Sequence, residues 1–491
     1  MNYRRRAPIQ VIGKVERLEA ELVAPQRDGR LDRALTRVSG APLRHGNSLV
    51  LLHDGPATYA DWLAAIGRAQ RWVHIENYIF KADSIGQRFA AALAERAAAG
   101  VQVRVLYDWF GSLDVPNAFW RRLRRAGVDV RCVNPLWNGS PLDIFQRDHR
   151  KLLAVDGDYA SLGGVCIADA WLAYSPVTGL PYRDTAVRVT GPAVADMEHA
   201  FANIWDSLGP PLPADEVPDL AGIAPAGDIE ARVIVQEPGR MRMLRTLQVV
   251  LAGVERRMWI ADAYFLATPI LREAIMAAAH DGVDVRILLP STNDVLLVGP
   301  LSRYGYRPLL QSGVRLWEYA GPMMHAKTIV ADGWWARVGS TNMNITGLLT
   351  NWELDLVAED RRFAAAMEAM YEEDLGNARE IRLGGVGRHG GPRATRPESR
   401  AERVARQHHP RVRSSGSVGL VRVSAAIQTA GSDSLQRNER TIGATIGALL
   451  LTVSLLSARF PRVIAWPLAL LGALLGAISL VRAASPEDED E

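Results

Sequence analysis

Hydrophobic and polar positions in the first part of the chain follow two alternating periods, one typical of buried strands and the other of amphipathic helices. Short apolar runs that predict strands occur at residues 48–53, 73–80 and 101–107. A spacing of three or four residues predicts helices near 59–69 and at 85–99. This order of elements predicts an α/β fold, in which helices cover a sheet.

The same order of elements returns later in the chain. Strands are predicted at residues 231–236, 258–265 and 283–289, with helices near 241–254 and at 269–280. The stretch Gly-Val-Gln-Val-Arg-Val-Leu from Gly100 matches Gly-Val-Asp-Val-Arg-Ile-Leu from Gly282 almost position for position. We therefore predict an internal duplication, whose halves are connected by residues 208–228, a segment rich in Pro, Ala and Gly.

Both flanks of the duplicated part differ from it in composition. Residues 1–45 are basic and polar, with one possible helix around residues 15–23, and form a predicted leader to the first domain. Residues 384–436 form a predicted arginine-rich flexible linker, because little apolar periodicity remains there. Such an arm is either simply solvated or attracted to anionic lipid headgroups.

Two apolar runs follow, at residues 442–458 and 463–481. As helices they would span about 26 and 29 Å, close to the ~30 Å hydrocarbon core of a bilayer. We predict a membrane hairpin over residues 437–482, which either crosses the bilayer or re-enters on the same side. Residues 483–491 form an acidic tail.

Composition narrows the function only slightly. The 491 residues include 57 Lys and Arg against 54 Asp and Glu, and this net charge of +3 gives no general argument for a nucleic-acid partner. Two cysteines, Cys132 and Cys166, do not support a disulfide framework and fit a reducing compartment. Residues 1–20 lack the apolar core of a signal peptide, so we expect the catalytic part to face the cytoplasm.

Two copies of one motif carry the candidate chemistry. Both have the pattern H-x-K-x-x-x-x-D, with His149, Lys151 and Asp156 in one and His325, Lys327 and Asp332 in the other. On an extended strand, residues two apart point to the same face, so each histidine and its lysine are expected to face one site. A small-residue corner follows each motif, at residues 161–164 and 338–342, and is expected to bring backbone close to a ligand.

With these paired motifs the chain resembles the phospholipase D superfamily, in which two such motifs converge on one phosphodiester site. Within it, the chain is most similar to bacterial cardiolipin synthases of the type that lacks N-terminal transmembrane helices. The similarity covers roughly residues 46–383 and includes Ala-Tyr-Phe at 263–265. It implies two phospholipase D-like α/β domains, residues 46–212 and 213–383, packed around one shared active site.

The resemblance implies roles for the motif residues. His149 is the expected nucleophile, which forms a phosphohistidine, while His325 protonates the leaving alcohol and then activates the incoming one. Lys151 and Lys327 are expected to neutralise the non-bridging phosphate oxygens, so that no metal and no other cofactor is predicted.

Two carboxylates outside the motifs complete the candidate catalytic set. The family pattern implies that Glu353 orients His149 and that Asp184 orients the other motif histidine, each across the two halves. Asp156 and Asp332 belong to the set as motif residues, although they are better suited to tying the turn after each strand.

Other positions bear on substrate binding. Ser340 and Asn342 are the expected phosphate-binding residues in the second half. Cys166 stands where cardiolipin synthases usually have Asn, and a thiol is a weak hydrogen-bond donor. Asn344 and Thr346 replace the Asp and Arg that are common after the second motif. These departures concern the choice of acceptor more than catalysis itself.

The function expected from these features is a phosphatidyltransferase that joins two phospholipids into cardiolipin, with phosphatidylglycerol as donor. A phospholipase D that uses water as acceptor would need the same residues, and a superfamily nuclease or an inactive membrane-bound binding protein are further alternatives. The expected partners are phospholipids and an anionic membrane surface, without nucleic acid. The expected location is the bacterial inner membrane, and the oligomeric state is left open.

Overall fold

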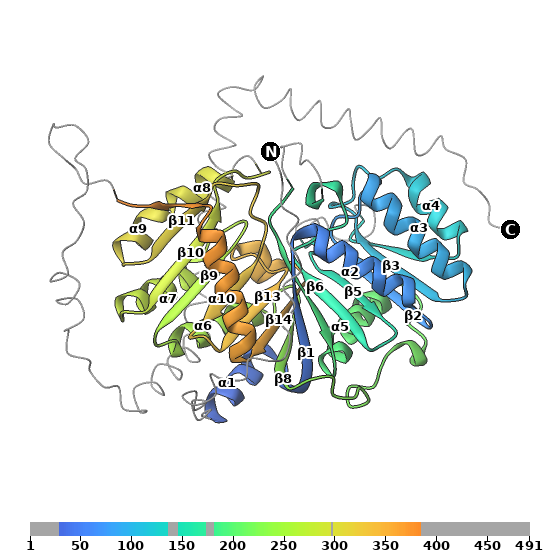
Figure 1. Ribbon diagram of the computed structural model, residues 1–491, viewed down its shortest axis with the longest axis horizontal. Helices are drawn as coiled ribbons and strands as arrows, with labels where there is room; N and C mark the ends of the chain where they lie inside the picture. The colour runs from blue at the N-terminus through green and yellow to red at the C-terminus, as the bar shows by residue number, and fades with distance from the viewer. Residues whose placement is uncertain (1–28, 136–145, 173–180, 296–297, 384–491) are drawn as a thin grey trace, which may run out of the picture. The chain divides into compact units, whose positions relative to one another are not determined.

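The computed structural model describes residues 29–135, 146–172, 181–295 and 298–383. Within these ranges the chain forms one mixed sheet of 15 strands (Figure 1). In sheet order, the first half contributes β1 (Arg44–His53), β7 (Thr185–Thr190), β6 (Tyr159–Gly163), β5 (Lys151–Val155), β2 (Trp72–Asn77), β3 (Gln102–Asp108) and β4 (Asp129–Val133). The second contributes β8 (Ile229–Gln236), β14 (Glu353–Glu359), β13 (Trp335–Gly339), β12 (Thr328–Ala331), β9 (Arg257–Ala261), β10 (Asp284–Pro290), β11 (Arg315–Tyr319) and the edge strand β15 (Ala378–Ile381).

The two halves of the sheet repeat each other around the β1–β8 pair. In each half, five strands pair antiparallel with their neighbours. Two further strands then extend the sheet in parallel, β3 and β4 in the first half and β10 and β11 in the second. The predicted α/β class and internal duplication are therefore confirmed.

Helices cover both faces of this sheet. In chain order they are α1 (Gly29–Ser39), α2 (Asp54–Arg68), α3 (Ser84–Ala98), α4 (Asn117–Arg125), α5 (Ala193–Ser207), α6 (Arg242–Gly253), α7 (Pro269–His280), α8 (Val298–Tyr304), α9 (Tyr306–Gln311) and α10 (Arg361–Leu375). Short helical turns lie at η2 (Asp169–Trp171), η3 (Ala214–Glu216) and the π-helical η4 (Thr346–Thr350).

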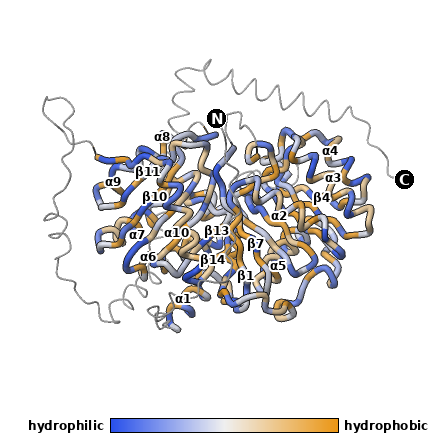
Figure 2. The backbone as a smooth tube through the Cα atoms, in the orientation of Figure 1, coloured by the Kyte–Doolittle hydropathy of each residue, from blue (hydrophilic) through white to orange (hydrophobic). Residues whose placement is uncertain are grey.

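Strand alternation separates two apolar cores in the first half. Val73 and Ile75 of β2 join a cluster with α2, α3 and α4 on one face. Leu152 and Ala154 of β5 point to the other face, where they pack with α5 and with Met367 of α10 from the second half. Hydrophobic segments accordingly follow the central strands in Figure 2. This second core joins the halves, and it fixes where the two motifs lie.

Two segments outside the repeated strands also pack on them. Part of the predicted leader is the helix α1, and the buried guanidinium of Arg232 in β8 donates to Thr36 of that helix at 2.6 Å. The leader thus contacts the second half, although the sequence placed it before the first. In the connection at residues 208–228, Glu216 accepts two hydrogen bonds of 2.6 Å from Arg104 of β3.

Several sequence predictions fall outside the described residues: the helix around 15–23, the linker at 384–436, the hairpin at 437–482 and the acidic tail at 483–491. Among the helices within the described ranges, none combines the length and the hydropathy needed to cross a bilayer. The division into domains at residues 46–212 and 213–383 stays a prediction.

Candidate active site

Both motif histidines lie just before a strand, since β5 begins two residues after His149 and β12 three residues after His325. One residue upstream of His149, Asp148 forms an isolated parallel bridge with Trp352, and Met324 forms the matching bridge with Arg183. Each histidine therefore lies just outside the strand that its motif predicts, and the expectation that it faces one site with its lysine stays a prediction. Just before each of these strands, the backbone pairs with a segment of the other half, and its pairing with the sheet of its own half has not yet begun.

The first bridge brings His149 to a carboxylate of the second half. The His149 amide donates to the Trp352 carbonyl at 2.9 Å, and the next residue, Glu353, has its carboxylate oxygens 2.9 and 3.1 Å from His149 Nδ1. Burial lowers the pKa of His149 to about 4, although Glu353 opposes this shift. A neutral imidazole held at Nδ1 has Nε2 available as a nucleophile.

The second bridge does the same for His325. Its amide donates to the Arg183 carbonyl at 2.7 Å, and its Nδ1 lies 2.7 Å from Asp184 Oδ2. Trp171 Nε1 donates to the same carboxylate oxygen at 2.8 Å, which fixes the carboxylate from a second side. Burial lowers the pKa of His325 and the neighbouring Lys327 lowers it further, while Asp184 opposes the shift. The structure thus brings both predicted histidine–carboxylate pairs together across the halves.

The two motif lysines hold positive charge beside the histidines. Lys151 Nζ and Lys327 Nζ each donate to the carbonyl oxygen of the histidine two residues earlier. Their ammonium groups lie 5.0 and 5.6 Å from the ring centres of Tyr78 and Tyr264. Burial lowers the pKa of Lys327 to about 8. Buried ammonium groups at this position can stabilise the charge that develops on a phosphoryl group.

Asp156 and Asp332 lie at the opposite ends of β5 and β12 from the histidines. Both adopt left-handed backbone conformations, with φ of 55° and 50°. The Asp156 carboxylate accepts the backbone amides of residues 70–72 at 2.8–2.9 Å, and Asp332 accepts those of residues 255–257 at the same distances. The assignment of these two aspartates as catalytic residues is therefore corrected. Each carboxylate instead holds the turn after its strand against the start of the neighbouring strand.

Glycines of the small-residue corners pack closely against buried carboxylates. A Cβ atom on Gly164 would lie 2.1 Å from Asp184 Oδ1, and one on Gly339 would lie 1.9 Å from Asp355 Oδ1. Glycine is needed there because a buried carboxylate occupies the space of a side chain. That the corners bring backbone close to a ligand stays a prediction, and Asn342, the last residue of the second corner, lines the pocket that contains both histidines.

The predicted phosphate-binding residues divide into two groups. Asn342 lines the pocket that contains both histidines, and its buried Oδ1 has no hydrogen-bond partner among the described residues. Ser340 is buried and is not among the residues that line this pocket; its hydroxyl accepts the Leu354 amide at 2.9 Å, and its role in phosphate binding stays a prediction. Cys166 is buried and lines the pocket, and burial raises the pKa of its thiol.

The pocket holds about 570 Å³ and is lined by residues of both halves. On the second-half side, Asn344 and Thr346 contribute to its wall. This volume lies within the range of ~300–1,000 Å³ that is usual for small-molecule sites. Substrate can therefore reach both histidines from one space.

Several lining residues were not assigned roles from the sequence. The Tyr78 ring lies 4.8 Å from the His149 ring, and Tyr264 lies 5.8 Å from His325, both edge-on. Tyr182 of the first half and Asp294 of the second also line the pocket. The tyrosines lie at the ends of matching predicted strands, at 73–80 and 258–265, and that repeat is the signal that could have identified them.

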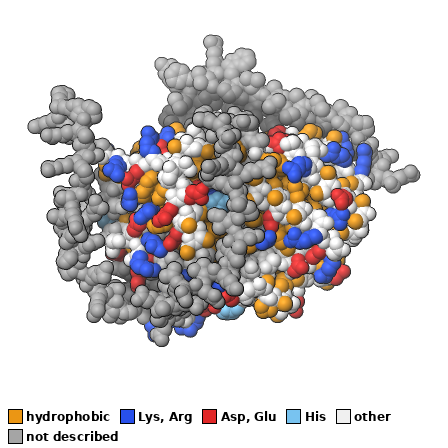
Figure 3. Space-filling view, viewed as in Figure 1, with side chains coloured by type: hydrophobic (Ala, Val, Ile, Leu, Met, Phe, Trp, Pro, Cys, Tyr) orange, Lys and Arg blue, Asp and Glu red, His pale blue; other side chains and the backbone are white. Residues whose placement is uncertain are grey.

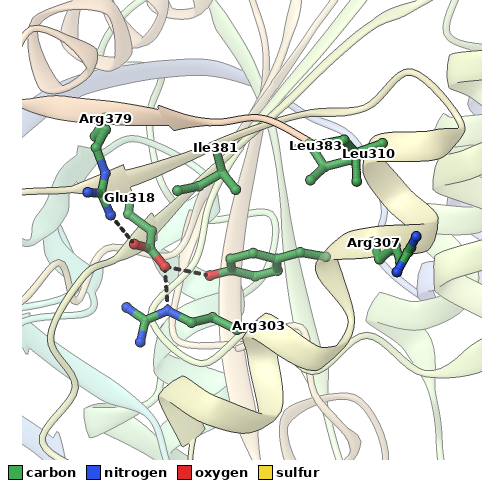
Figure 4. Close-up of a pocket in the computed structure, with 8 residues that line it drawn as sticks. Arg303, Arg307, Leu310, Glu318, Arg379, Ile381 and Leu383 are labelled. Atoms are coloured by element: carbon green, nitrogen blue, oxygen red, sulfur yellow. Dashed lines mark hydrogen bonds and ion pairs between the residues drawn. The ribbon is translucent and has the colours of Figure 1, made fainter. Parts of the chain in front are cut away.

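A second hollow, of about 670 Å³, lies between α8, α9 and β15 and contains neither histidine (Figure 4). The buried Glu318 carboxylate is one of its lining groups, and Arg303 donates to it at 2.7 Å and Arg379 at 3.5 Å. These arginines are therefore occupied by a protein carboxylate, and the hollow offers no comparable chemistry. Within the described ranges, no group of three or more His, Cys, Asp or Glu side chains could hold a metal ion.

Comparison with known proteins agrees with this geometry. The family model described as "Cardiolipin synthase, PLD-like domain" matches residues 62–205 and 250–375. Cardiolipin synthase A of Pseudomonas syringae pv. syringae is 32% identical over 354 residues, which cover 71% of this chain and 73% of the relative. "Probable cardiolipin synthase YwiE" of Bacillus subtilis is 29% identical over 337 residues, covering 68% and 67%.

A solved structure shares the fold. The crystal structure of phosphatidylserine synthase from Haemophilus influenzae Rd KW20 superposes with a TM-score of 0.55 at 16% identity, covering 72% of this chain and 92% of that one. At this identity the similarity concerns the fold alone.

Proposed function

This chain belongs to the cardiolipin synthase family of PLD-like domain proteins, and we propose that it transfers a phosphatidyl group between two phospholipids through a phosphohistidine. It is an enzyme of the phospholipid-modifying phospholipase D superfamily, and the resemblance inferred from its paired motifs is confirmed. The observation that carries the proposed mechanism is the pair of crossed contacts, His149 with Glu353 and His325 with Asp184, at one pocket.

In the first step, Nε2 of His149 attacks the phosphorus atom of phosphatidylglycerol. The phosphorus–oxygen bond to the headgroup breaks, and protonated His325 gives its proton to the leaving glycerol oxygen. Binding of the anionic phosphodiester favours this protonated form, since it adds negative charge beside an imidazole whose pKa burial has lowered.

In the second step, His325 accepts the proton of a hydroxyl on a second phosphatidylglycerol. The resulting oxygen attacks the phosphorus atom, and the phosphorus–nitrogen bond to His149 breaks. Cardiolipin leaves, and both histidines return to their starting states, so the net products are cardiolipin and glycerol. Lys151 and Lys327 stabilise the phosphoryl oxygens in both steps, and Asn342 offers a further contact.

The site opens among exposed apolar side chains. Phe110 and Val295 line the pocket, and the nearby helix α8 has no buried residue. Large hydrophobic residues between 47 and 90% exposed in these segments and next to Asn344 are Phe110, Leu113, Val295, Leu301, Tyr304 and Ile345. Exposed apolar groups around a pocket favour a membrane partner, and a bilayer supplies the phospholipid. We assign this rim to the membrane surface.

The proposed location is the inner face of the bacterial cell membrane. Arg437 and Arg440 precede the first apolar run of the predicted hairpin and Arg482 follows the second, a distribution that favours the cytoplasmic side for both ends. On the face shown in Figure 3, basic and acidic side chains are interspersed, which fits a lipid partner better than nucleic acid.

Incubation of the purified protein with phosphatidylglycerol in detergent and a chelator tests the function. Cardiolipin and glycerol should appear in equal amounts. Phosphatidic acid as the sole lipid product would assign a hydrolase, and loss of all activity in chelator would contradict the proposed use of lysine charge. A Phe110→Ser, Leu301→Ser variant should lose activity on vesicles but keep it on detergent-dispersed lipid if the rim contacts the membrane.

A further inference from the structure

One carboxylate in the pocket has no role in the mechanism above. Asp294 follows β10 and lines the wall of the pocket near its mouth. The Tyr264 hydroxyl donates to Asp294 Oδ1 at 2.7 Å, and the Tyr182 hydroxyl donates to Oδ2 at 3.4 Å. Two tyrosines from different halves thus hold this carboxylate at the edge of the site.

These tyrosines also place Asp294 beside His325. The rings of Tyr264 and Tyr182 lie 5.8 and 6.0 Å from the His325 ring. The carboxylate is close enough to His325 to favour its protonated form. Asp294 is therefore next to the histidine that handles the alcohol in the proposed mechanism.

The cations that line the pocket are paired with carboxylates. Arg147 lies 3.6 Å from Asp108, and Lys81 is paired with Asp114. The phosphate is therefore left to the motif lysines and Asn342, and Asp294 is available to another part of the substrate.

A carboxylate beside a phosphodiester site cannot serve to bind the phosphate, because like charges repel. It can accept hydrogen bonds, and each of its oxygens has lone pairs beyond the one used by a tyrosine. The matching group on a phospholipid is a donor on the headgroup, either a hydroxyl of glycerol or the ammonium of ethanolamine.

We propose that Asp294, held by Tyr264 and Tyr182, binds the hydrogen-bond donor of the headgroup alcohol at His325 and so selects which phospholipids react. This assignment rests on the proposed function and defines the headgroup side of the same site. A phospholipid whose headgroup lacks such a hydrogen-bond donor should therefore be a poor substrate.

The test compares three donor lipids, phosphatidylglycerol, phosphatidylethanolamine and phosphatidylpropanol, whose headgroup has no donor; phosphatidylglycerol is the common acceptor, and release of glycerol, ethanolamine or propanol measures each donor. In Asp294→Asn, kcat/KM for the preferred natural lipid should fall about 10- to 100-fold, as expected for a lost hydrogen bond to a charged group. The value for phosphatidylpropanol should stay within about twofold, since that lipid makes no such bond. Preference of the unaltered protein for glycerol or ethanolamine identifies the donor as hydroxyl or ammonium.

Glu273→Gln is the matched control, because this exposed residue of α7 loses the same charge on a surface outside the pocket. Equal losses on all three lipids in Asp294→Asn would overturn the headgroup assignment while leaving the transferase intact. Failure of the unaltered protein to turn over any phospholipid would overturn the proposed function, and the assignment with it.

Discussion

Gly164 packs against Asp184 so closely that a Cβ atom on it would lie 2.1 Å from Oδ1 of that carboxylate. The position of Asp184 in turn sets that of His325, since Asp184 Oδ2 lies 2.7 Å from His325 Nδ1. The absence of a side chain at Gly164 in the first half therefore determines where Asp184 lies and, through it, the position of the His325 ring in the second half.

The substitution Gly164→Ala should displace Asp184 and lower turnover about 100-fold, the effect expected when a reacting group moves by about 1 Å. Steady-state assays on phosphatidylglycerol, with a thermal melt in parallel, measure this effect. Gly67→Ala in α2 is the control, because no atom lies within 4 Å of the added Cβ, and it should leave turnover unchanged. Similar activity in both variants would show that Asp184 tolerates displacement.

Histidine variants should separate the two proposed roles. His149→Ala should abolish every reaction, because the nucleophile is lost. His325→Ala should still release one equivalent of 4-nitrophenol from a 4-nitrophenyl phosphodiester, since this leaving group departs without a proton. Rapid-mixing absorbance and phosphorylated-peptide mapping detect that burst. A burst from His149→Ala and none from His325→Ala would reverse the roles.

The pH dependence should show the titration of Lys327, whose pKa burial lowers to about 8. Below that pH the ammonium attracts the phosphodiester, and above it the charge is lost, so kcat/KM should fall as pH rises through about 8. Measurements from pH 6 to 10 at constant ionic strength test this, with circular dichroism to verify the fold. A constant value from pH 7 to 10 would contradict the role of Lys327, and a separate fall below pH 7 would report His325, the proposed acid, whose pKa burial lowers.

Stability should depend on Arg183, which joins the halves. Its buried guanidinium donates two hydrogen bonds of 2.8 Å to Asp374 of α10. Arg183→Met leaves Asp374 unpaired and should lower the free energy of unfolding by about 3–5 kcal/mol. Arg362→Met, at an exposed pair with Asp228, should cost no more than about 1 kcal/mol. Denaturant titration measures both, and equal costs would refute a specific contribution of Arg183.

The sequence by itself determined the local elements and the chemical groups. The apolar run Leu152–Val155 predicts a buried strand because periodicity records local burial, and all of β5 is buried. The duplicated motifs identified both histidines and both lysines, since two copies repeat the same spacing. The family pattern that these motifs brought in supplied Glu353 and Asp184.

Only the tertiary structure decided which groups meet. His149 and Glu353 are 204 residues apart, and their contact depends on the order of strands and on bridges that no period in the sequence encodes. For the same reason, the sequence did not show that Ser340 is buried against Leu354 or that tyrosines of both halves hold Asp294 at the pocket. Periodicity specifies the face of an element that is buried, whereas the packing of distant elements specifies its neighbours.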